Sequence, residues 1–448
     1  MAERMKAVAA AGAVAAFWLA VWVFAAALVA QPLILPGPGA VVVALLRLVC
    51  DAATWAILAG SGARILGGLA LAAVCGGVLA GASVRSRTFA RLVAPALSFV
   101  KATPVACVVV LLLIWLGSAR VSIAAVFLMA LPGVYFSLVE GLTQADKPLE
   151  QMFRLHGVRG WRLFCAHIWR EVLPFVLSCA RAVIGMSWKA GVAAELIGMA
   201  VGTVGERIYQ AKLLIETADL LAWTVLVVMA SWACERVLVW LLRASGPAAW
   251  RAAVLSHGRG LRGRAGAADV AELALAVGDR APWAPALDGL VLNVPAGGRI
   301  CVMGTSGVGK STLLALAAGE CVPCSMVFQD VRLVEGASAL DNVLVCADAR
   351  VDASSAAALL RLLVPGVDVH ARVAELSGGQ RRRVEIARAL LCPGGAVILD
   401  EPFTGLDTAA RDACAEVVLD LLVGRMLLLA THDAVDAQAL NISDIITL

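Results

Sequence analysis

The chain has 448 residues, of which 61% are hydrophobic, and its mean hydropathy is +0.87. Soluble proteins rarely reach that hydropathy, and the length allows two or three domains. The net charge of +4 is small for this size and does not indicate nucleic-acid binding.

Six apolar segments in the first half are long enough to cross a hydrocarbon core of roughly 30 Å. The third is short, although its start can be moved back to Ala94. The first follows Arg4 and Lys6 without a convincing cleavage motif, so we interpret it as a retained helix. The six segments lie at about 10–30, 63–83, 103–118, 120–140, 174–199 and 221–243.

Basic residues collect on one side of these segments. In a six-span arrangement, the N-terminus shares that side with the loops after the second, fourth and sixth segments. The positive-inside rule therefore predicts a multi-pass protein of the cytoplasmic (inner) membrane, with its C-terminal half in the cytoplasm. The bases of these loops are Arg85, Arg87, Arg91, Lys147, Arg154, Arg159, Arg162, Arg170, Arg243, Arg251, Arg259, Arg262 and Arg264.

Two features of the membrane half allow more than one interpretation. The loop at 141–174 is amphipathic, so its helices either lie against a soluble partner or rest in the membrane interface. Lys189 lies well inside the fifth segment, where a lysine costs roughly 2.5–3.5 kcal/mol. It either lines a solute pathway or forms a structural pair, for example with Glu195 of a second chain. A cation that lines a pathway favours an anionic solute.

The composition changes after the sixth segment. Residues 245–266 are rich in Gly, Arg and Ser, and we interpret them as a basic linker that can contact anionic lipid. We therefore divide the chain into a transmembrane domain at 1–244, this linker, and a soluble domain at 267–448.

The soluble domain contains "GTSGVGKST" at 304–312, between a short apolar run and a helical pattern. Its glycines allow backbone N–H groups to turn toward phosphates, and the helix N-terminus adds a favourable dipole. Lys310 can reach the β- and γ-phosphates of ATP, and Ser311 can offer a hydroxyl to Mg²⁺. The predicted nucleotide-binding residues of this loop are Gly304, Thr305, Ser306, Gly307, Gly309, Lys310, Ser311 and Thr312.

Two further motifs belong to the same chemistry. "AVILDEP" at 396–402 ends an apolar strand in Asp400, beside the Mg²⁺ site, and Glu401, which can polarise the attacking water. "LSGGQ" at 376–380 opens a helix, whose N-terminus is a second expected anion-binding site. One nucleotide does not need two such helix termini from the same chain. Two facing chains would use both termini. The residues of this motif are Ser377, Gly378, Gly379 and Gln380.

These motifs follow one another in the order of an ATP-binding-cassette ATPase, and about 268–448 resembles that family. The match includes Gln329 in "VFQD", Asp407 in "GLD" and His432 in "LLLATHD". The resemblance implies a head-to-tail dimer in which Ser377 serves the ATP of the partner.

The same resemblance implies roles for single residues. Glu401 would be the catalytic base, His432 would contact the γ-phosphate, and Gln329 would sense Mg²⁺ and the membrane domain. The chain departs from the family in two places. Lys310 and Gln329 are only 19 positions apart (329 − 310), so a β-hairpin that family members carry is largely missing. The usual adenine-stacking aromatic is replaced by Val277, with Trp283 as the nearest candidate.

The membrane half, at about 15–243, resembles permeases of nitrate, sulfonate and taurine importers. The similarity lies in "LPGPGAVV", "SGARILGGLALA", "VKATPVACVVVLLLIWLG" and "SWKAGVAAELIG". Such permeases carry a coupling loop that docks on the ATPase near its glutamine. Here Gly157 and Pro174 match the loop pattern. Gln151 replaces its glutamate, the bulkier Met152 and Phe153 replace its two alanines, and Arg170 replaces one proline.

We therefore predict an α-helical membrane domain of about six transmembrane helices followed by an α/β P-loop ATPase domain. Such a half-transporter would hydrolyse ATP with Mg²⁺ and work with a second copy of itself or a related half-transporter. Import would need an external solute-binding protein. The solute would be a small anion such as a sulfonate, taurine or nitrate, or alternatively a thiamine-precursor-like molecule. A catalytically weak ATP-binding membrane regulator is the alternative from another class.

Overall fold

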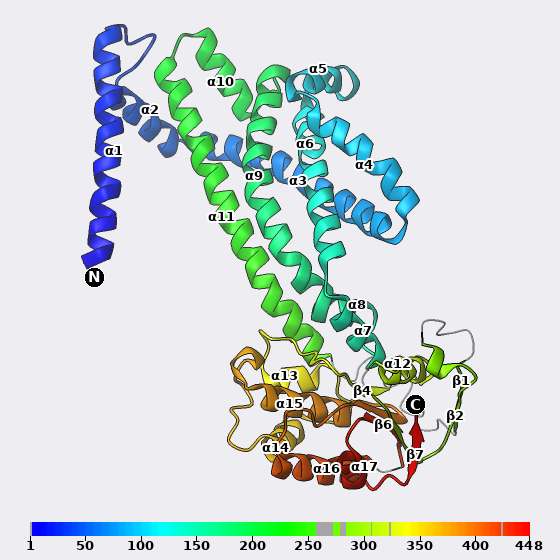
Figure 1. Cartoon of the computed structure of the whole chain (residues 1–448). Helices are drawn as coiled ribbons and strands as arrows, with labels where there is room; N and C mark the ends of the chain where they lie inside the picture. The colour runs from blue at the N-terminus through cyan, green and yellow to red at the C-terminus, as the bar shows by residue number, and fades with distance from the viewer. Residues whose placement is uncertain (1, 257–271, 278–283, 306, 322–323, 423) are drawn as a thin grey trace. The chain divides into compact units, whose positions relative to one another are not determined.

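The computed structural model describes residues 2–256, 272–277, 284–305, 307–321, 324–422 and 424–448 (Figure 1). The chain forms two compact units. The helical unit contains residues 1–144 and 172–245. The sheet unit contains residues 246–448 together with the loop at 145–171, which comes from the middle of the membrane half.

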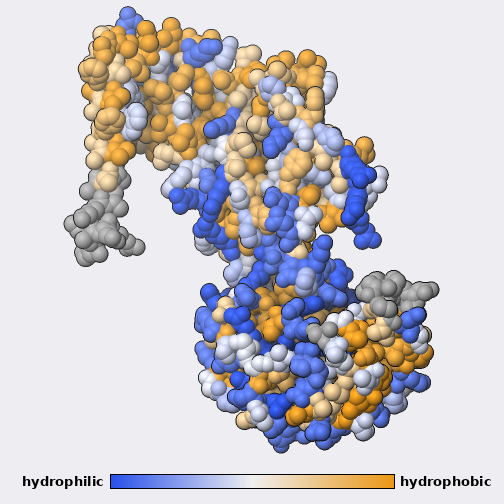
Figure 2. Space-filling model, viewed as in Figure 1, coloured by the Kyte–Doolittle hydropathy of each residue, from blue (hydrophilic) through white to orange (hydrophobic). Residues whose placement is uncertain are grey.

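Most of the helical unit consists of long apolar helices. Among the described residues, five helical stretches are long and apolar enough to cross a membrane, or six if one bent pair counts as a span. Much of the visible face of this unit is apolar in Figure 2, as expected for a lipid-facing surface. The helices are α1 (Ala2–Val29), α2 (Pro38–Cys50), α3 (Ala52–Arg85), α4 (Arg87–Ala102), α5 (Val105–Leu116), α6 (Ser118–Gln144), α9 (Trp169–Gly198), α10 (Val204–Leu213) and α11 (Thr217–Leu255).

The third expected span differs from a single helix. The helix axis bends by 103° between α4 and α5. Pro104 causes the break because it has no N–H to donate and disfavours helical geometry at the residue before it. Thr103 is accordingly extended, with φ −76° and ψ 129°.

Close helix contacts depend on small residues. A Cβ on Gly68 of α3 would lie 2.5 Å from the carbonyl oxygen of Ile123 in α6, and a Cβ on Gly76 would lie 2.8 Å from Val134 Cγ1. Glycine at both positions therefore lets α3 and α6 approach closely, as is common between membrane helices.

The sheet unit is built on a parallel sheet of five strands in the order β4-β5-β6-β3-β7, with a separate antiparallel pair, β1 and β2. Every residue of β5 and β6 is buried, which agrees with their continuous apolar sequence. The strands are β1 (Glu272–Ala276), β2 (Val291–Pro295), β3 (Arg299–Met303), β4 (Ser325–Val327), β5 (Ala396–Asp400), β6 (Met426–Thr431) and β7 (Asp444–Thr447).

The helices of this unit surround the sheet and include two from the membrane half. They are α7 (Lys147–Leu155), α8 (Gly160–Leu163), α12 (Lys310–Glu320), α13 (Ala339–Leu344), α14 (Ala353–Leu363), α15 (Gly378–Leu391), α16 (Thr408–Leu422) and α17 (Ala434–Ala439). Only residues 321–324 separate α12 from β4, which leaves no room for a β-hairpin.

Residues 246–255, which we expected in a linker, are the helical end of α11. The rest of that expected linker, 257–266, lies outside the described residues.

Candidate functional site

The carboxyl ends of three neighbouring strands bring the motif residues to one edge of the sheet. β3 leads into the glycine loop, β5 ends at Asp400, and β6 ends just before His432. Ligand sites of open parallel sheets usually lie at this edge, so the fold places the expected catalytic groups together.

The glycine loop has a backbone that other residues rarely adopt. Gly307 has φ 85° and Gly309 has φ 117°, and Gly309 caps the N-terminus of α12. Lys310 is buried, and its Nζ donates hydrogen bonds to the carbonyl oxygens of Gly304 (2.7 Å) and Thr305 (3.0 Å). The lysine charge therefore points back into the loop, toward the place where phosphates bind in such motifs. Ser306 lies outside the described residues.

Asp400 and Ser311 supply two oxygen donors beside this loop. Asp400 is buried, and burial raises the pKa of its carboxyl group, while the Ser311 hydroxyl and the Lys310 charge oppose that rise. Carboxylate and hydroxyl oxygens are the ligands that Mg²⁺ prefers. The donor set thus fits Mg²⁺, with Asp400 and Ser311 as candidate ligands.

Glu401 is held in an unusual conformation. Its φ is +47°, which is uncommon for a residue with a side chain, and its N–H donates to the carbonyl oxygen of Ala430 at 2.9 Å. Its Oε1 lies 3.3 Å from Nδ1 of His432, whose side chain is 64% exposed. The two predicted catalytic groups are therefore adjacent, and the histidine can orient the carboxylate.

The "LSGGQ" segment starts α15 as a capping box. The Ser377 hydroxyl accepts from the Gln380 N–H, and the Gln380 side chain accepts from the Ser377 N–H at 2.9 Å. Ser377 and Gly378 are exposed, and a Cβ on Gly378 would meet no atom within 4 Å. Asp407 accepts from the Ala410 N–H at the start of α16. Its side chain is thus engaged in a helix cap.

Gln329 has an exposed side chain but an anchored backbone. Three buried charged residues of α15, which we call the α15 triad (Arg382, Glu385 and Arg388), hold the segment around it. Arg382 donates to the carbonyl oxygens of Phe328 and Gln329, and to Glu385 at 2.9 Å. The helix that begins with the "LSGGQ" segment therefore also fixes the glutamine segment.

The triad also fixes Arg332. Glu385 accepts from the Arg332 N–H (3.1 Å), and Arg388 donates to the Arg332 carbonyl oxygen (2.6 Å). The Arg332 side chain stacks on Phe328 and donates to α7 at the Gln151 amide oxygen and the Pro148 carbonyl oxygen, both 3.2 Å away. Arg332 thus joins α7 of the membrane half to the glutamine segment. No sequence motif points to this residue.

The loop at 145–171 is part of the hydrophobic core of the sheet unit. Met152 and Phe153, the two bulky replacements for alanine, are completely buried in that core. Burying such side chains stabilises by about 1.5–3 kcal/mol each. The Cys324 N–H also donates to the Leu155 carbonyl oxygen at 3.0 Å, and Arg162 donates to that of Val345 at 2.9 Å.

Gly157 follows α7 with φ +78°, and its N–H donates to the carbonyl oxygen of Arg154 at 3.1 Å. Any other residue would be strained there. Pro174 lies outside this packed loop, inside α9 in the helical unit.

His156 gives the docked loop a pH dependence. It is fully buried, and its Nδ1 lies 2.8 Å from the Met152 carbonyl oxygen, which it can only reach as a donor. Burial, together with the nearby Arg388 and Arg425, lowers its pKa to about 3. An undocked or unfolded histidine binds a proton below its usual pKa of about 6.5, whereas the buried one does not. Stability therefore falls as pH decreases below that value.

We expect the His156 contribution to lower the unfolding free energy by about 2 kcal/mol as the pH decreases from about 7.5 to about 5. His156→Gln should remove this component while leaving the contributions of all other groups. Chemical unfolding of both proteins across this range measures the difference. Equal pH slopes would contradict the assignment of a neutral buried histidine.

Lys189 and Glu195 lie in different surroundings of the helical unit. Lys189 is exposed on α9, and no ion pair to it exists within the part of the chain that the structure describes. Glu195 is buried, accepts from Ser61 at 2.8 Å, and lies 3.5 Å from Arg64.

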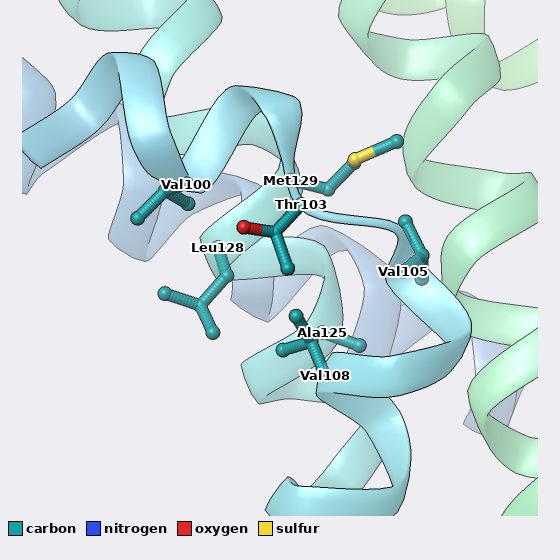
Figure 3. Close-up of a pocket in the computed structure, with 7 residues that line it drawn as sticks. All are labelled: Val100, Thr103, Val105, Val108, Ala125, Leu128 and Met129. Carbon is teal, nitrogen blue, oxygen red and sulfur yellow. The ribbon is translucent and has the colours of Figure 1, made fainter.

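A small pocket lies at the elbow between α4 and α5 (Figure 3). Its lining is apolar apart from Thr103, whose hydroxyl donates to the Phe99 carbonyl oxygen at 2.9 Å. The pocket has no charged lining residue, so it does not provide a site for an ion. The lining residues are Val100, Thr103, Val105, Val108, Ala125, Leu128 and Met129.

Val277 is buried and donates its N–H to the Leu290 carbonyl oxygen, so its side chain belongs to the core. The alternative adenine-stacking candidate, Trp283, lies outside the described residues.

Two family models match the chain. The one described as "Binding-protein-dependent transport system inner membrane component" matches residues 73–251, and the one described as "ABC transporter" matches residues 322–404. A solved dimeric bacterial ABC transporter cassette is 24% identical, with a TM-score of 0.33, over 36% of this chain and 86% of its own.

The chain is also similar to curated import proteins. It is 35% identical over 182 residues to an aliphatic sulfonates import ATP-binding protein of Rhizobium johnstonii, covering 35% of this chain and 66% of that protein. Identity to the protein of that name from Paracoccus denitrificans is 34% over 185 residues, covering 38% and 75%. A taurine import ATP-binding protein of Chromobacterium violaceum is 38% identical over 182 residues, covering 34% and 68%.

Proposed function

Because the chain belongs to the ABC transporter family and joins a permease domain to an ATP-binding domain, we propose that it imports a small anion at the expense of ATP. The observation that carries this proposal is the loop at 145–171. It belongs to the membrane half by sequence, yet it is built into the core of the ATP-binding unit. Changes at the nucleotide site therefore have a direct path to the helices on either side of this loop.

The residues of the nucleotide site have separate tasks in this proposal. The glycine loop and the N-terminus of α12 bind the ATP phosphates, and Lys310 adds positive charge. Asp400 and Ser311, with the Gln329 side chain, would hold Mg²⁺, which neutralises charge on the phosphates when bound. Glu401 accepts a proton from the attacking water, and His432 orients the Glu401 carboxylate.

The exposed N-terminus of α15 supports a dimer. Ser377 and Gly378 carry no contact in the described chain that would prevent a second copy from presenting ATP to them. Either a homodimer or a pair with a related half-transporter would supply two such sites. We place the ATP-binding unit in the cytoplasm, the spans in the inner membrane, and a solute-binding protein outside it.

One open face of α9 supports an anionic solute. Positions 178, 181, 182, 185 and 189 recur at the spacing of one helix face, and most are exposed. A Cβ on Gly185 would meet no atom within 4 Å. Two cations, Arg181 and Lys189, lie on this face inside a spanning helix, where each would cost roughly 2.5–3.5 kcal/mol against lipid. A water-filled path between two copies would relieve that cost and would favour an anion. Glu195 lies off this face with its own partners, so we do not assign it to the path.

We expect Lys189→Met to reduce uptake at least about tenfold, because losing one charge contact is worth about 1.4 kcal/mol or more. Basal ATPase activity and expression should be unchanged, since the Lys189 side chain makes no ion pair or hydrogen bond with the residues of the protomer that the structure describes. Lys212→Met, on the connecting helix α10, is a matched control. Uptake at the normal rate by the Lys189 variant would contradict a pathway role.

The whole proposal is tested in proteoliposomes that contain the purified chain. A candidate solute-binding protein is added, together with labelled taurine, an alkanesulfonate, nitrate or a thiamine precursor. ATP-dependent uptake of one anion is expected, and Lys310→Ala should abolish it. Uptake of only the thiamine precursor would mean that the solute is a thiamine-precursor-like molecule and not a small anion. ATP binding without hydrolysis or uptake would favour a regulator, which the short segment between Lys310 and Gln329 makes the second candidate.

A further inference from the structure

Arg170 occupies the position at which related permeases carry a proline. Its contacts give a reason for an arginine at this position. Its guanidinium lies 5.7 Å from the ring centroid of Trp250. On another side it lies against Gly336, where a Cβ would collide with Arg170 Nη2. Arg170, at the start of α9, is therefore packed against two other segments of the sheet unit.

Trp250 connects the same place to α13. It lies near the end of α11, is largely buried, and donates from Nε1 to Asp341 Oδ2 at 3.2 Å. An indole combines a face for a cation with an N–H donor, so one side chain holds Arg170 and Asp341 at once.

α13 is in turn fixed to the segment that follows Arg332. The neighbouring Asn342 is buried, and its side chain binds both the N–H and the carbonyl oxygen of Val334, at 2.7 Å and 3.1 Å. The short stretch from Arg332 to Asn342 thus carries two contacts from the membrane half. Arg332 forms hydrogen bonds with α7, and Asp341 accepts a hydrogen bond from Trp250 near the end of α11.

We propose that Arg170, Gly336, Trp250 and Asp341, which we call the Trp250 clamp, form a second transmission contact between ATP hydrolysis and the spans. α9 and α11 each run from the clamp into the helical unit as one helix. Movement of α13 therefore acts on two spanning helices directly, in parallel with the action of α7. This inference rests on the proposed coupling of ATP to transport.

The test measures a distant part of the membrane half. α10 connects α9 to α11 at the ends remote from the clamp, so its hydrogen exchange reports on both helices. Exchange of peptides covering Val204–Leu213 is compared with and without ATP in the full-length Glu401→Gln protein in nanodiscs. We expect an ATP-dependent change in this protein, and loss of most of that change when Trp250→Phe, which keeps the ring but not the donor, is added.

Two Asp341 variants make the result specific. Asp341→Asn retains an acceptor oxygen and should retain the change, whereas Asp341→Leu should lose it. With Glu401 intact, all three clamp variants should keep the KM for ATP, because the phosphate loop is untouched. An undiminished change in Trp250→Phe and Asp341→Leu, or no ATP-dependent change in the parent, would overturn the clamp. Absence of ATP binding and hydrolysis in the unmodified chain would instead refute the proposed function.

Discussion

A Glu401→Gln variant is expected to bind ATP normally but to hydrolyse it about 10²–10⁴-fold more slowly, the range for loss of a positioned base. The amide keeps the shape of the side chain and its place beside His432, but it cannot accept a proton from water. Lys310, Asp400 and Ser311 are unchanged, so the phosphate and Mg²⁺ contacts persist. ATPase assays and nucleotide-binding titrations on the purified protein measure both quantities.

Two companion variants separate binding from chemistry. Lys310→Ala should lose nucleotide affinity, because the loop then lacks its only described buried cation. Glu416→Gln, on the exposed face of α16, should behave as the unmodified protein. If ATP accumulates in a closed dimer only in Glu401→Gln, the dimer arrangement gains support. Undiminished turnover in that variant would remove Glu401 from the role of base.

The strand ends and helix starts that carry the nucleotide-binding motifs could be predicted from sequence because the motifs are local. Each one combines a strand end with a turn or helix start, so spacing alone specifies where Lys310, Asp400 and Ser377 lie in the fold. The bend at Thr103 also had a visible signal, since a proline in an apolar run disfavours one continuous helix. Hydropathy alone predicts a single span over this run.

The contacts that join segments of the membrane half to the sheet unit could not be predicted in this way. Arg332 and Gln151 are 181 positions apart, and Trp250 and Asp341 are 91 apart, so no local pattern connects them. Lys189 and Glu195 show the opposite case. Their separation of 6 positions (195 − 189) places them on different faces of a helix, which periodicity already indicates.

The α15 triad leads to the largest expected effect on stability. Glu385 is the one acid of the triad, and it lies between Arg382 (2.9 Å) and Arg388 (3.3 Å) with almost no exposed surface. Burial raises the pKa of its carboxyl group, and the two arginines oppose that rise. Removing one partner from such a buried ionic cluster costs about 3–5 kcal/mol, because the remaining charges stay buried without compensation.

We therefore expect Glu385→Ala to lower the unfolding free energy of the sheet unit by about 3–5 kcal/mol, and Glu416→Ala, on the surface, to change it little. Glu385→Gln should fall between them, since its one amide oxygen can keep either the bond from Arg382, at the Oε2 position, or the bond from the Arg332 N–H, at the Oε1 position, but not both. Chemical unfolding of the full chain, monitored by tryptophan fluorescence, measures the three unfolding free energies. A loss below about 1 kcal/mol in Glu385→Ala, the level of a surface ion pair, would mean that the arginines find other partners. The carbonyl oxygens of Phe328, Gln329 and Arg332 already accept from these arginines, so the variant also tests whether backbone dipoles alone can hold the glutamine segment on α15.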